Sequence, residues 1–372
     1  ATEISIPLHT IINTSIRTGV FPEGWKLSKT IPILKKGDPT QTSNYRPVSC
    51  LPAASKVLES VILKQLTAYF EKNNLLPSQQ HGFRAGRSTT TALASMIADW
   101  SSAYEAGLST GVLLWDLSSA FDTIDIDTLC QKLSIYGLTT RTVSWFRSFL
   151  TSRQQRVQVG NEISQPETIS VGCPQGSLLS PILFLIYIAD LDQWVEDVSV
   201  KGYADDTVSS VSDACEESII RKLEADAGRI LRFMASNYLV ANPQKTGFLL
   251  IRKKKTSTTR SIKIGGKVVE EEECHRILGL TVNNTLSWKD HVIGKGGLLS
   301  AVYQRIGALR RIVHHVPKKC LPNIATAIIS SKIRYSISVY GTVRLTKDEP
   351  LTEECRKLQI ALNDAMRVAN GS

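Results

Sequence analysis

Apolar residues recur along the 372-residue chain at two spacings, which predict a mixture of helices and strands. Apolar residues three or four positions apart are typical of helices with one buried face. This spacing predicts helices at residues 4–16, in a stretch ending at 66, and at 89–100, 124–133, 143–150, 178–191, 216–237, 292–313, 321–335 and 352–368.

Short runs of β-favouring residues lie between these helices. The runs are residues 30–34, 111–117, 155–159, 167–171, 198–200, 208–211, 248–251, 262–264, 268–269 and 276–282. Residues 262–264 and 268–269 flank Gly265-Gly266, which predicts a hairpin.

The run Gly111–Leu117 is almost continuously apolar but contains Asp116 near its end. Such a run is typical of a strand buried on both faces. A carboxylate there is costly unless it binds a metal or strong donors. Ser119 and Asp122 have the spacing of a capping box, so we expect a helix to begin there, with Asp122 as an acid of its first turn.

A second pair of acids, Asp205 and Asp206, lies between two β-favouring runs and follows Tyr203. We expect a hairpin with these acids at its tip. Side chains alternate along a strand, so the two carboxylates should point in different directions, with one as the principal ligand. Adjacent like charges favour a bound cation. The alternative is an ordinary exposed turn, in which Asp is common.

Two strands that end in acids together predict a phosphoryl-transfer site with two Mg²⁺ ions. Mg²⁺ prefers carboxylate and phosphate oxygens. Two ions roughly 3.5–4 Å apart can hold the attacking and leaving oxygens of an in-line displacement. Residues 116–122 (DLSSAFD), 172–177 (GCPQGS) and 203–206 (YADD) resemble three successive polymerase motifs of reverse transcriptases. The sequences of these motifs are most similar to those of non-LTR (LINE-type) retrotransposons.

The resemblance implies the α+β class and a right-hand polymerase fold with fingers, an antiparallel-sheet palm and a helical thumb. It implies fingers at 1–110, the first part of the palm at 111–127, a fingers/palm insertion at 128–171, the palm at 172–286 and a helical thumb or connection at 287–372. Cationic residues gather in the last segment, which predicts contacts with nucleic-acid phosphates. They are Arg305, Arg310, Arg311, Lys318, Lys319, Lys332 and Arg334.

The resemblance also implies roles for single residues. Asp116, Asp205 and Asp206 would hold the metals, with Lys245 near the leaving pyrophosphate. The incoming nucleotide would contact Lys35, Lys36, Arg46, Phe121, Gln175 and Gly176. Template and primer would contact Arg84, Arg87, Tyr203, Leu278 and Gly279. The alternatives are solvated basic turns for the lysines, local bonds for Arg84 and Arg87, and core packing for Phe121.

The composition of the chain agrees with an enzyme that acts on nucleic acids. The net charge of +10 favours a polyanionic partner. Seven scattered cysteines form no Cys-x-x-Cys pair, so neither a disulfide framework nor a zinc ribbon is predicted, and we expect reduced thiols inside a cell. No run is apolar over a membrane-spanning length, so we expect no membrane partner. Ala1 already lies in a predicted helix, so we expect a piece of a longer protein.

The sequence thus predicts an RNA-directed DNA polymerase that extends a primer 3′-hydroxyl with dNTPs, with Mg²⁺ as cofactor and Mn²⁺ as a substitute. We expect an RNA template, a DNA primer or target DNA, and a location in the nucleus or in a cytoplasmic ribonucleoprotein. Two alternatives stay open: an inactive RNA-binding relic of the same fold, and another two-metal enzyme such as a nuclease. Four positions differ from the residues common in the family motifs, but none of them replaces a metal ligand: Ser119, Cys173, Ser180 and Gly202.

Overall fold

The computed structural model describes residues 2–35, 37–117, 121–241, 246–253, 259–341 and 352–370. The chain divides into two compact units, each assembled from segments that are far apart in the sequence. Unit 1 comprises Ala1–Phe83, Asp116–Glu196 and Asp226–Asn242, and unit 2 comprises Arg84–Trp115, Asp197–Ala225 and Pro243–Ser372.

Unit 1 contains a five-stranded sheet and helices of both α and 3₁₀ type. The sheet has the order β2-β1-β4-β5, with β6 also paired to β4. Its strands are β1 (Leu27–Leu34), β2 (Tyr45–Cys50), β4 (Arg153–Val159), β5 (Glu162–Ile163) and β6 (Glu167–Ile169). The helices are α1 (Thr2–Thr18), η1 (Glu23–Trp25), η2 (Thr42–Asn44), α2 (Ala53–Lys72), α4 (Ile126–Ile135), α5 (Thr140–Leu150), α6 (Ser180–Tyr187) and η3 (Leu191–Trp194).

The core of unit 1 follows from its apolar sequence. Every residue of α6 except Pro181 is buried, because this helix is apolar on all sides. An aromatic group joins the end of α1 to α5: the ring of Phe21 lies 5.1 Å from that of Phe149, and Trp145 stacks on Phe149 at 5.7 Å. Pro181 lies in the first turn of α6, as the sequence predicted, where its missing N–H costs nothing.

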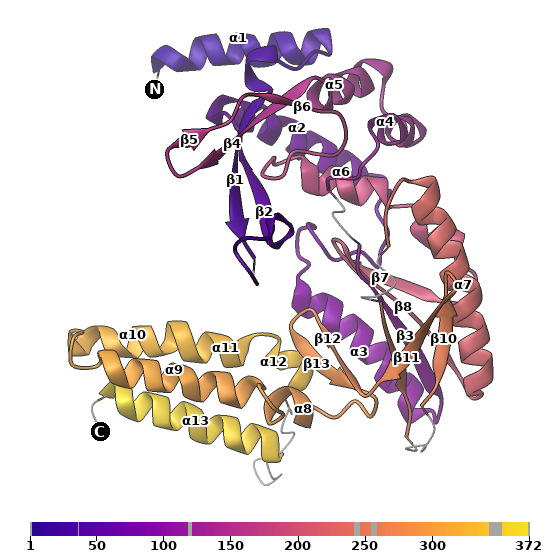
Figure 1. Ribbon diagram of the computed structural model, residues 1–372, viewed down its shortest axis with the longest axis vertical. Helices are drawn as coiled ribbons and strands as arrows, with labels where there is room; N and C mark the ends of the chain where they lie inside the picture. Colours follow the sequence, from indigo (N-terminus) through magenta and orange to yellow (C-terminus); the bar gives the residue numbers. More distant parts are fainter. Residues whose placement is uncertain are drawn as a thin grey trace. The chain divides into compact units, whose positions relative to one another are not determined.

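Unit 2 is built on a six-stranded sheet of order β10-β11-β9-β3-β8-β7 (Figure 1). Its strands are β3 (Ser109–Trp115), β7 (Ser199–Tyr203), β8 (Asp206–Asp213), β9 (Gly247–Ile251), β10 (Ser261–Ile264) and β11 (Lys267–Glu272). The apolar strand β3 is central, flanked by β8 and β9 in antiparallel register. Helix α7 (Glu216–Ser236) begins in this unit and crosses one face so closely that a Cβ at Gly111 would lie 2.4 Å from Ile219.

The other face of the sheet shares one core with helices that follow residue 287. Helix α3 (Thr89–Glu105) contributes Trp100, and β3 contributes Val112. The later helices are α8 (Lys289–Val292), α9 (Leu298–Ile312), η4 (Lys318–Cys320), α10 (Leu321–Ala325), the π-helical turn η5 (Thr326–Ser330), α11 (Ser331–Arg334), α12 (Ile337–Tyr340) and α13 (Glu353–Asn370). Leu309 and Ala365 are among their fully buried side chains.

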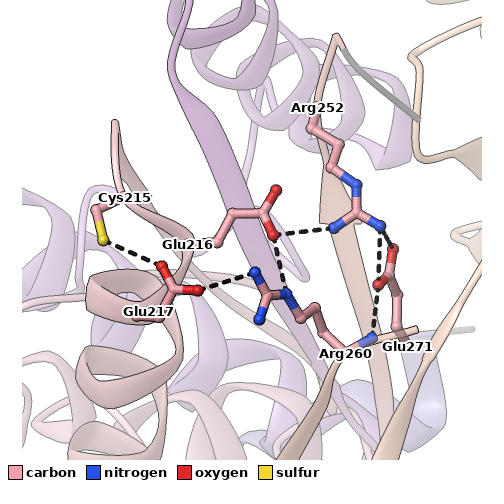
Figure 2. A network of polar contacts seen from close by, with 6 residues as sticks. All are labelled: Cys215, Glu216, Glu217, Arg252, Arg260 and Glu271. Carbon is pink, nitrogen blue, oxygen red and sulfur yellow. Dashed lines mark hydrogen bonds and ion pairs between the residues drawn. The ribbon is translucent and has the colours of Figure 1, made fainter. Parts of the chain in front are cut away.

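A network of ion pairs joins the start of α7 to the β9–β11 edge of this sheet (Figure 2). The Arg252 guanidinium donates to Glu216 at 3.3 Å and to Glu271 at 2.8 Å. Arg260 donates to the same oxygen of Glu216 and to Glu217. The Arg252 and Glu271 side chains are only 7% and 6% exposed, so this pair is shielded from solvent. The network therefore fixes the sheet edge against α7.

Most predicted elements are confirmed, and two local predictions are wrong. Helix α4 begins at Ile126 with Asp125 as its N-cap, whereas Phe121 and Asp122 lie in a turn. Asp125 is the N-cap because its carboxylate accepts hydrogen bonds from both the backbone N–H and the hydroxyl of Thr128. Residues 276–282 form two strands, β12 (Cys274–Ile277) and β13 (Leu280–Asn283), separated by a turn at Leu278 and Gly279.

Candidate active site

The acids Asp205 and Asp206 lie at the tip of the β7–β8 hairpin, as predicted. Tyr203 pairs with Asp206 across the hairpin, so Ala204 and Asp205 form its two-residue turn. Ala204 has a φ of +59°, which is the left-handed backbone that tight hairpin turns require. Both aspartates are exposed, with Asp205 in the turn and Asp206 in the strand. The hairpin thus presents two adjacent carboxylates to solvent.

Strand β3 ends beside this hairpin within the sheet of unit 2. Its last residue, Trp115, pairs with Thr207, and the indole N–H of Trp115 donates to the Ser209 hydroxyl at 3.0 Å. Asp116 is the next residue along the chain and is half-buried. The prediction that Asp116 follows the carboxyl end of a core strand is therefore confirmed.

The hairpin is anchored to α3 by Lys201, for which no role was predicted. The buried ammonium of Lys201 donates to the Asp99 carboxylate at 2.5 Å and to the Ser95 carbonyl at 2.9 Å. A lysine inside an apolar strand was the signal, because a buried cation requires partners. Lys201 thereby ties the strand that leads to the acids to a rigid helix.

The chemistry of these acids fits a hard divalent cation, because carboxylate oxygens are its preferred ligands. Across the described ranges, no three His, Cys, Asp or Glu side chains are grouped closely enough to hold a metal ion. Lys245, expected near the leaving group, lies outside the described residues.

The loop with Gln175 and Gly176 lies in unit 1 against strand β2. Ser49 N–H donates to the Gln175 carbonyl at 3.0 Å. Gly176 has a φ of +108°, and a Cβ there would lie 2.4 Å from the Ser49 carbonyl oxygen. Only glycine allows so close an approach. The Gln175 side-chain amide donates to both carboxylate oxygens of Asp122, at 2.8 Å each.

Phe121 lies next to this loop. Its carbonyl accepts from the Cys173 N–H at 2.8 Å, and its half-buried ring lies 5.1 Å from that of Phe184. Cys173 itself is buried, which raises the pKa of its thiol to about 12. Unit 1 therefore brings Phe121 together with Gln175 and Gly176, which lie 54 and 55 positions later in the sequence.

The basic candidates on the β1–β2 hairpin are exposed. Arg46 pairs with Ile33 across the hairpin, and Lys35 follows β1 and donates its backbone N–H to the Asn44 carbonyl at 2.8 Å. Arg46 stands on the same strand as Ser49, which holds the Gln175 loop. Lys36 lies outside the described residues.

The template and primer candidates lie in unit 2. Arg84 and Arg87 are half-buried in a turn before Ser88, whose side chain caps α3 in a capping box with Thr91. The predicted helix start at residue 89 is thus confirmed. Leu278 and Gly279 form the β12–β13 turn, and the Tyr335 hydroxyl donates to the Leu278 carbonyl at 2.7 Å. Tyr335 was not predicted, because nothing in the local pattern connects it with a turn 57 residues away.

None of the helices described is long and apolar enough to cross a membrane. This agrees with the absence of a long apolar run in the sequence.

Comparisons with known proteins agree with the motifs. A probable RNA-directed DNA polymerase from transposon BS of Drosophila melanogaster is 28% identical over 322 residues, which cover 82% of this chain and 34% of that protein. The RNA-directed DNA polymerase from mobile element jockey of the same species is 25% identical over 343 residues, with 90% and 37% covered. This chain thus spans about a third of the length of these curated relatives.

Among solved structures, apo telomerase from Candida tropicalis is similar with a TM-score of 0.48 and 12% identity, over 75% of this chain and 58% of that one. The family model described as reverse transcriptase (RNA-dependent DNA polymerase) matches residues 33–282 and so includes all three motifs. The α+β, right-hand polymerase fold predicted from the sequence is the fold of this family, and the chain belongs to the reverse transcriptase family.

Proposed function

We propose that this chain is the catalytic segment of an RNA-directed DNA polymerase from a non-LTR retrotransposon. It extends a primer 3′-hydroxyl by attack on the α-phosphorus of a dNTP, copying RNA into DNA. The observation that carries the proposal is the β7–β8 hairpin, which presents Asp205 and Asp206 beside the strand that leads directly into Asp116. This arrangement favours catalysis over an inactive relic, because a relic has no need to keep three carboxylates.

Reverse transcriptases generally use divalent metal ions. Asp116, Asp205 and Asp206 would hold two Mg²⁺ ions, for which Mn²⁺ can substitute. When bound, such ions increase the acidity of the attacking hydroxyl and neutralise charge on the leaving pyrophosphate. Asp205, in the turn, is the principal ligand of the pair, and Asp206, the first residue of β8, is the lesser one, because the side chains of adjacent residues point in different directions.

The incoming dNTP lies along residues of unit 1. Arg46, with Lys35 and Lys36, faces the triphosphate, since guanidinium and ammonium groups complement phosphate oxygens. Gln175 and Gly176 line the base and sugar, and the Phe121 ring excludes a 2′-hydroxyl. Lys245 stabilises or protonates the leaving group. The shared loop contacts of Phe121, Gln175 and Ser49 support this assignment.

Template and primer lie along Arg84, Arg87, Tyr203 and the Leu278-Gly279 turn. The partners are an RNA template and a DNA primer, which nicked target DNA supplies in elements of this kind. We assign fingers to 1–110, palm to 111–127 and 172–286, an insertion to 128–171 and a thumb to 287–372. The protein acts in the nucleus or in a cytoplasmic ribonucleoprotein.

Primer extension on poly(rA)/oligo(dT) with Mg²⁺ tests the proposal. The wild-type chain should extend the primer, and Asp205→Asn should abolish extension while duplex binding stays close to normal. Asp206→Asn should be milder. Asp213→Asn is a matched control on the same hairpin: that carboxylate bonds to Lys222 and Ser218 at the far end of β8 and should be dispensable for chemistry.

Each alternative gives a different result. A relic binds the duplex without extending the primer, and a nuclease shortens it. Full extension by Asp205→Asn would overturn the metal-site assignment.

A further inference from the structure

The loop of residues 172–177 is held from several sides within unit 1. Gly172 N–H donates to the Ile124 carbonyl at 2.9 Å, and Cys173 N–H donates to the Phe121 carbonyl at 2.8 Å. Ser49 holds the Gln175 carbonyl, and Asp122 holds its side chain. These contacts fix the start and middle of the loop. They do not fix its end, the segment between Gly176 and the start of α6.

Glu59 of α2 fixes that end. One oxygen of its carboxylate accepts from the Ser177 hydroxyl at 2.7 Å and from the Leu178 N–H at 2.8 Å. The other oxygen accepts from the Ser55 hydroxyl at 3.1 Å. Glu59 is fully buried, and Ser177 is only 7% exposed. A buried carboxylate is retained only where its partners repay the cost of desolvation, so this contact is specific rather than incidental.

A buried cation in the same unit attracts this carboxylate electrostatically. Arg153, at the start of β4, is 2% exposed, and its guanidinium lies 5.1 Å from the centre of the Phe149 ring. Burial lowers the pKa of Arg153, and the negative charge of Glu59 opposes that shift. The end of the loop is thus bonded to a buried carboxylate, that of Glu59, which limits the movement of the loop.

We propose that Glu59 is a positioning residue for the incoming nucleotide: it sets the distance of Gln175 and Gly176 from the dNTP by holding Ser177 and Leu178. The inference rests on the proposed function, because it assigns the loop to the dNTP. The Glu59 side chain touches neither substrate nor metal. Its loss should therefore weaken dNTP use and leave primer–template binding unchanged.

The test compares Glu59→Ala, Glu59→Gln and Ser177→Ala in steady-state extension, with active enzyme counted by primer–template titration. Glu59→Ala should raise KM for dNTP roughly tenfold or more, the factor expected for lost hydrogen bonds to a charged group, with a much smaller change in kcat. Glu59→Gln should restore KM to within about threefold of wild type, because its amide oxygen still accepts from Ser177 and Leu178, while its NH₂ can donate to Ser55.

Asp226→Ala is the matched control for a purely structural role. Asp226 is also fully buried, and it accepts from the Glu196 N–H and from Arg229. Its loss should lower Tm without changing KM for dNTP. If Glu59→Ala behaves like Asp226→Ala, with a lower Tm and an unchanged KM, Glu59 only supports the fold and the inference is wrong.

Ser177→Ala keeps the inference testable if Glu59→Ala does not fold. It removes one of the two loop contacts and leaves the buried carboxylate bonded to Leu178 and Ser55. KM for dNTP should rise by roughly threefold to tenfold, and an unchanged KM would overturn the inference. Failure of the proposed function is distinguishable, because then the wild-type chain itself extends no primer.

Discussion

The Gln175 side-chain amide donates to both carboxylate oxygens of Asp122, at 2.8 Å each, although the two residues are 53 positions apart. The sequence suggested that Asp122 is an acid of a helix start, but α4 begins four residues later, at Ile126. Asp122 instead orients a side chain that we assign to the nucleotide. Under the proposed function, Asp122 acts on the nucleotide site through Gln175.

Asp122→Ala should raise KM for dNTP by roughly threefold to tenfold, because a freed Gln175 amide samples several rotamers. Asp122→Asn retains one amide oxygen as acceptor and should be milder. The measurement is single-nucleotide extension at varied dNTP concentration. Asp127→Ala is the control, since that exposed acid pairs with Arg147 on the neighbouring helix. An equal effect of both Ala variants would contradict the role of Asp122.

Phe121→Val should admit ribonucleotides. The ring is held between the turn and Phe184, with its carbonyl fixed by Cys173, so shortening it opens space without releasing the loop. The ratio of kcat/KM for dGTP over rGTP should fall at least roughly tenfold. Phe184→Leu, which changes the packing beneath the ring, should leave that ratio intact. A constant ratio in Phe121→Val with lower activity would make Phe121 a packing residue.

Binding of primer–template should weaken steeply with salt, because phosphate contacts release counterions. Lys318 and Lys319 are exposed on η4, whereas Arg310 already bonds to both oxygens of Asp364. Each contacting lysine changed to Gln should reduce the log–log salt slope by roughly 0.7–0.9. Arg310→Gln should change it less. Fluorescence anisotropy at several salt concentrations measures the slope. Equal slopes in all variants would show that Lys318 and Lys319 do not contact the primer–template.

Glu271→Ala should destabilise the sheet edge of unit 2. It removes the closer carboxylate partner of the buried Arg252 guanidinium and leaves, among the described residues, the more distant Glu216 carboxylate at 3.3 Å. Breaking a buried ion pair in this way costs on the order of 3 kcal/mol. Asp127→Ala breaks the exposed pair with Arg147 and should cost less than about 1 kcal/mol. Urea unfolding measures both, and similar losses would show that the burial of the Arg252–Glu271 pair is unimportant for stability.

The stability of unit 2 should depend on pH through His291. Burial, followed by the charges of Lys332 and Arg276, lowers the pKa of this side chain from 6.5 to about 4. Its Nδ1 accepts from the Thr281 N–H at 3.3 Å, and the ring packs on Tyr340. The folded state therefore keeps a neutral imidazole, whereas the unfolded chain takes up a proton below its ordinary pKa.

Since the unfolded state binds more protons, the free energy of unfolding should fall as the pH drops from 6.5 to about 4. The total loss is on the order of 3 kcal/mol. His291→Asn keeps an acceptor for Thr281 but does not titrate in this window. Calorimetric Tm values across the window should show a smaller pH dependence in the variant, and an unchanged dependence would assign it to other groups.

Local patterns in the sequence determined the elements that carry the candidate site. The apolar run of β3 predicted a central strand ending at Asp116, and its flanking strands in unit 2 confirm this. The start of the α3 helix at Thr89 and the glycine pair of the β10–β11 hairpin were also predicted correctly. These predictions succeed because capping and turn formation depend on residues within one or two turns of each other.

The tertiary structure alone decided which of these elements meet. The bonds of Gln175 to Asp122 and of Ser177 to Glu59 span 53 and 118 residues. Nothing in the pattern of either segment specifies the other, because such contacts arise only when the intervening chain has packed. The same reason explains the wrong helix start: the spacing of Ser119 and Asp122 suits a capping box, but in the fold the Asp122 carboxylate is bonded to Gln175, and Asp125 caps the helix instead.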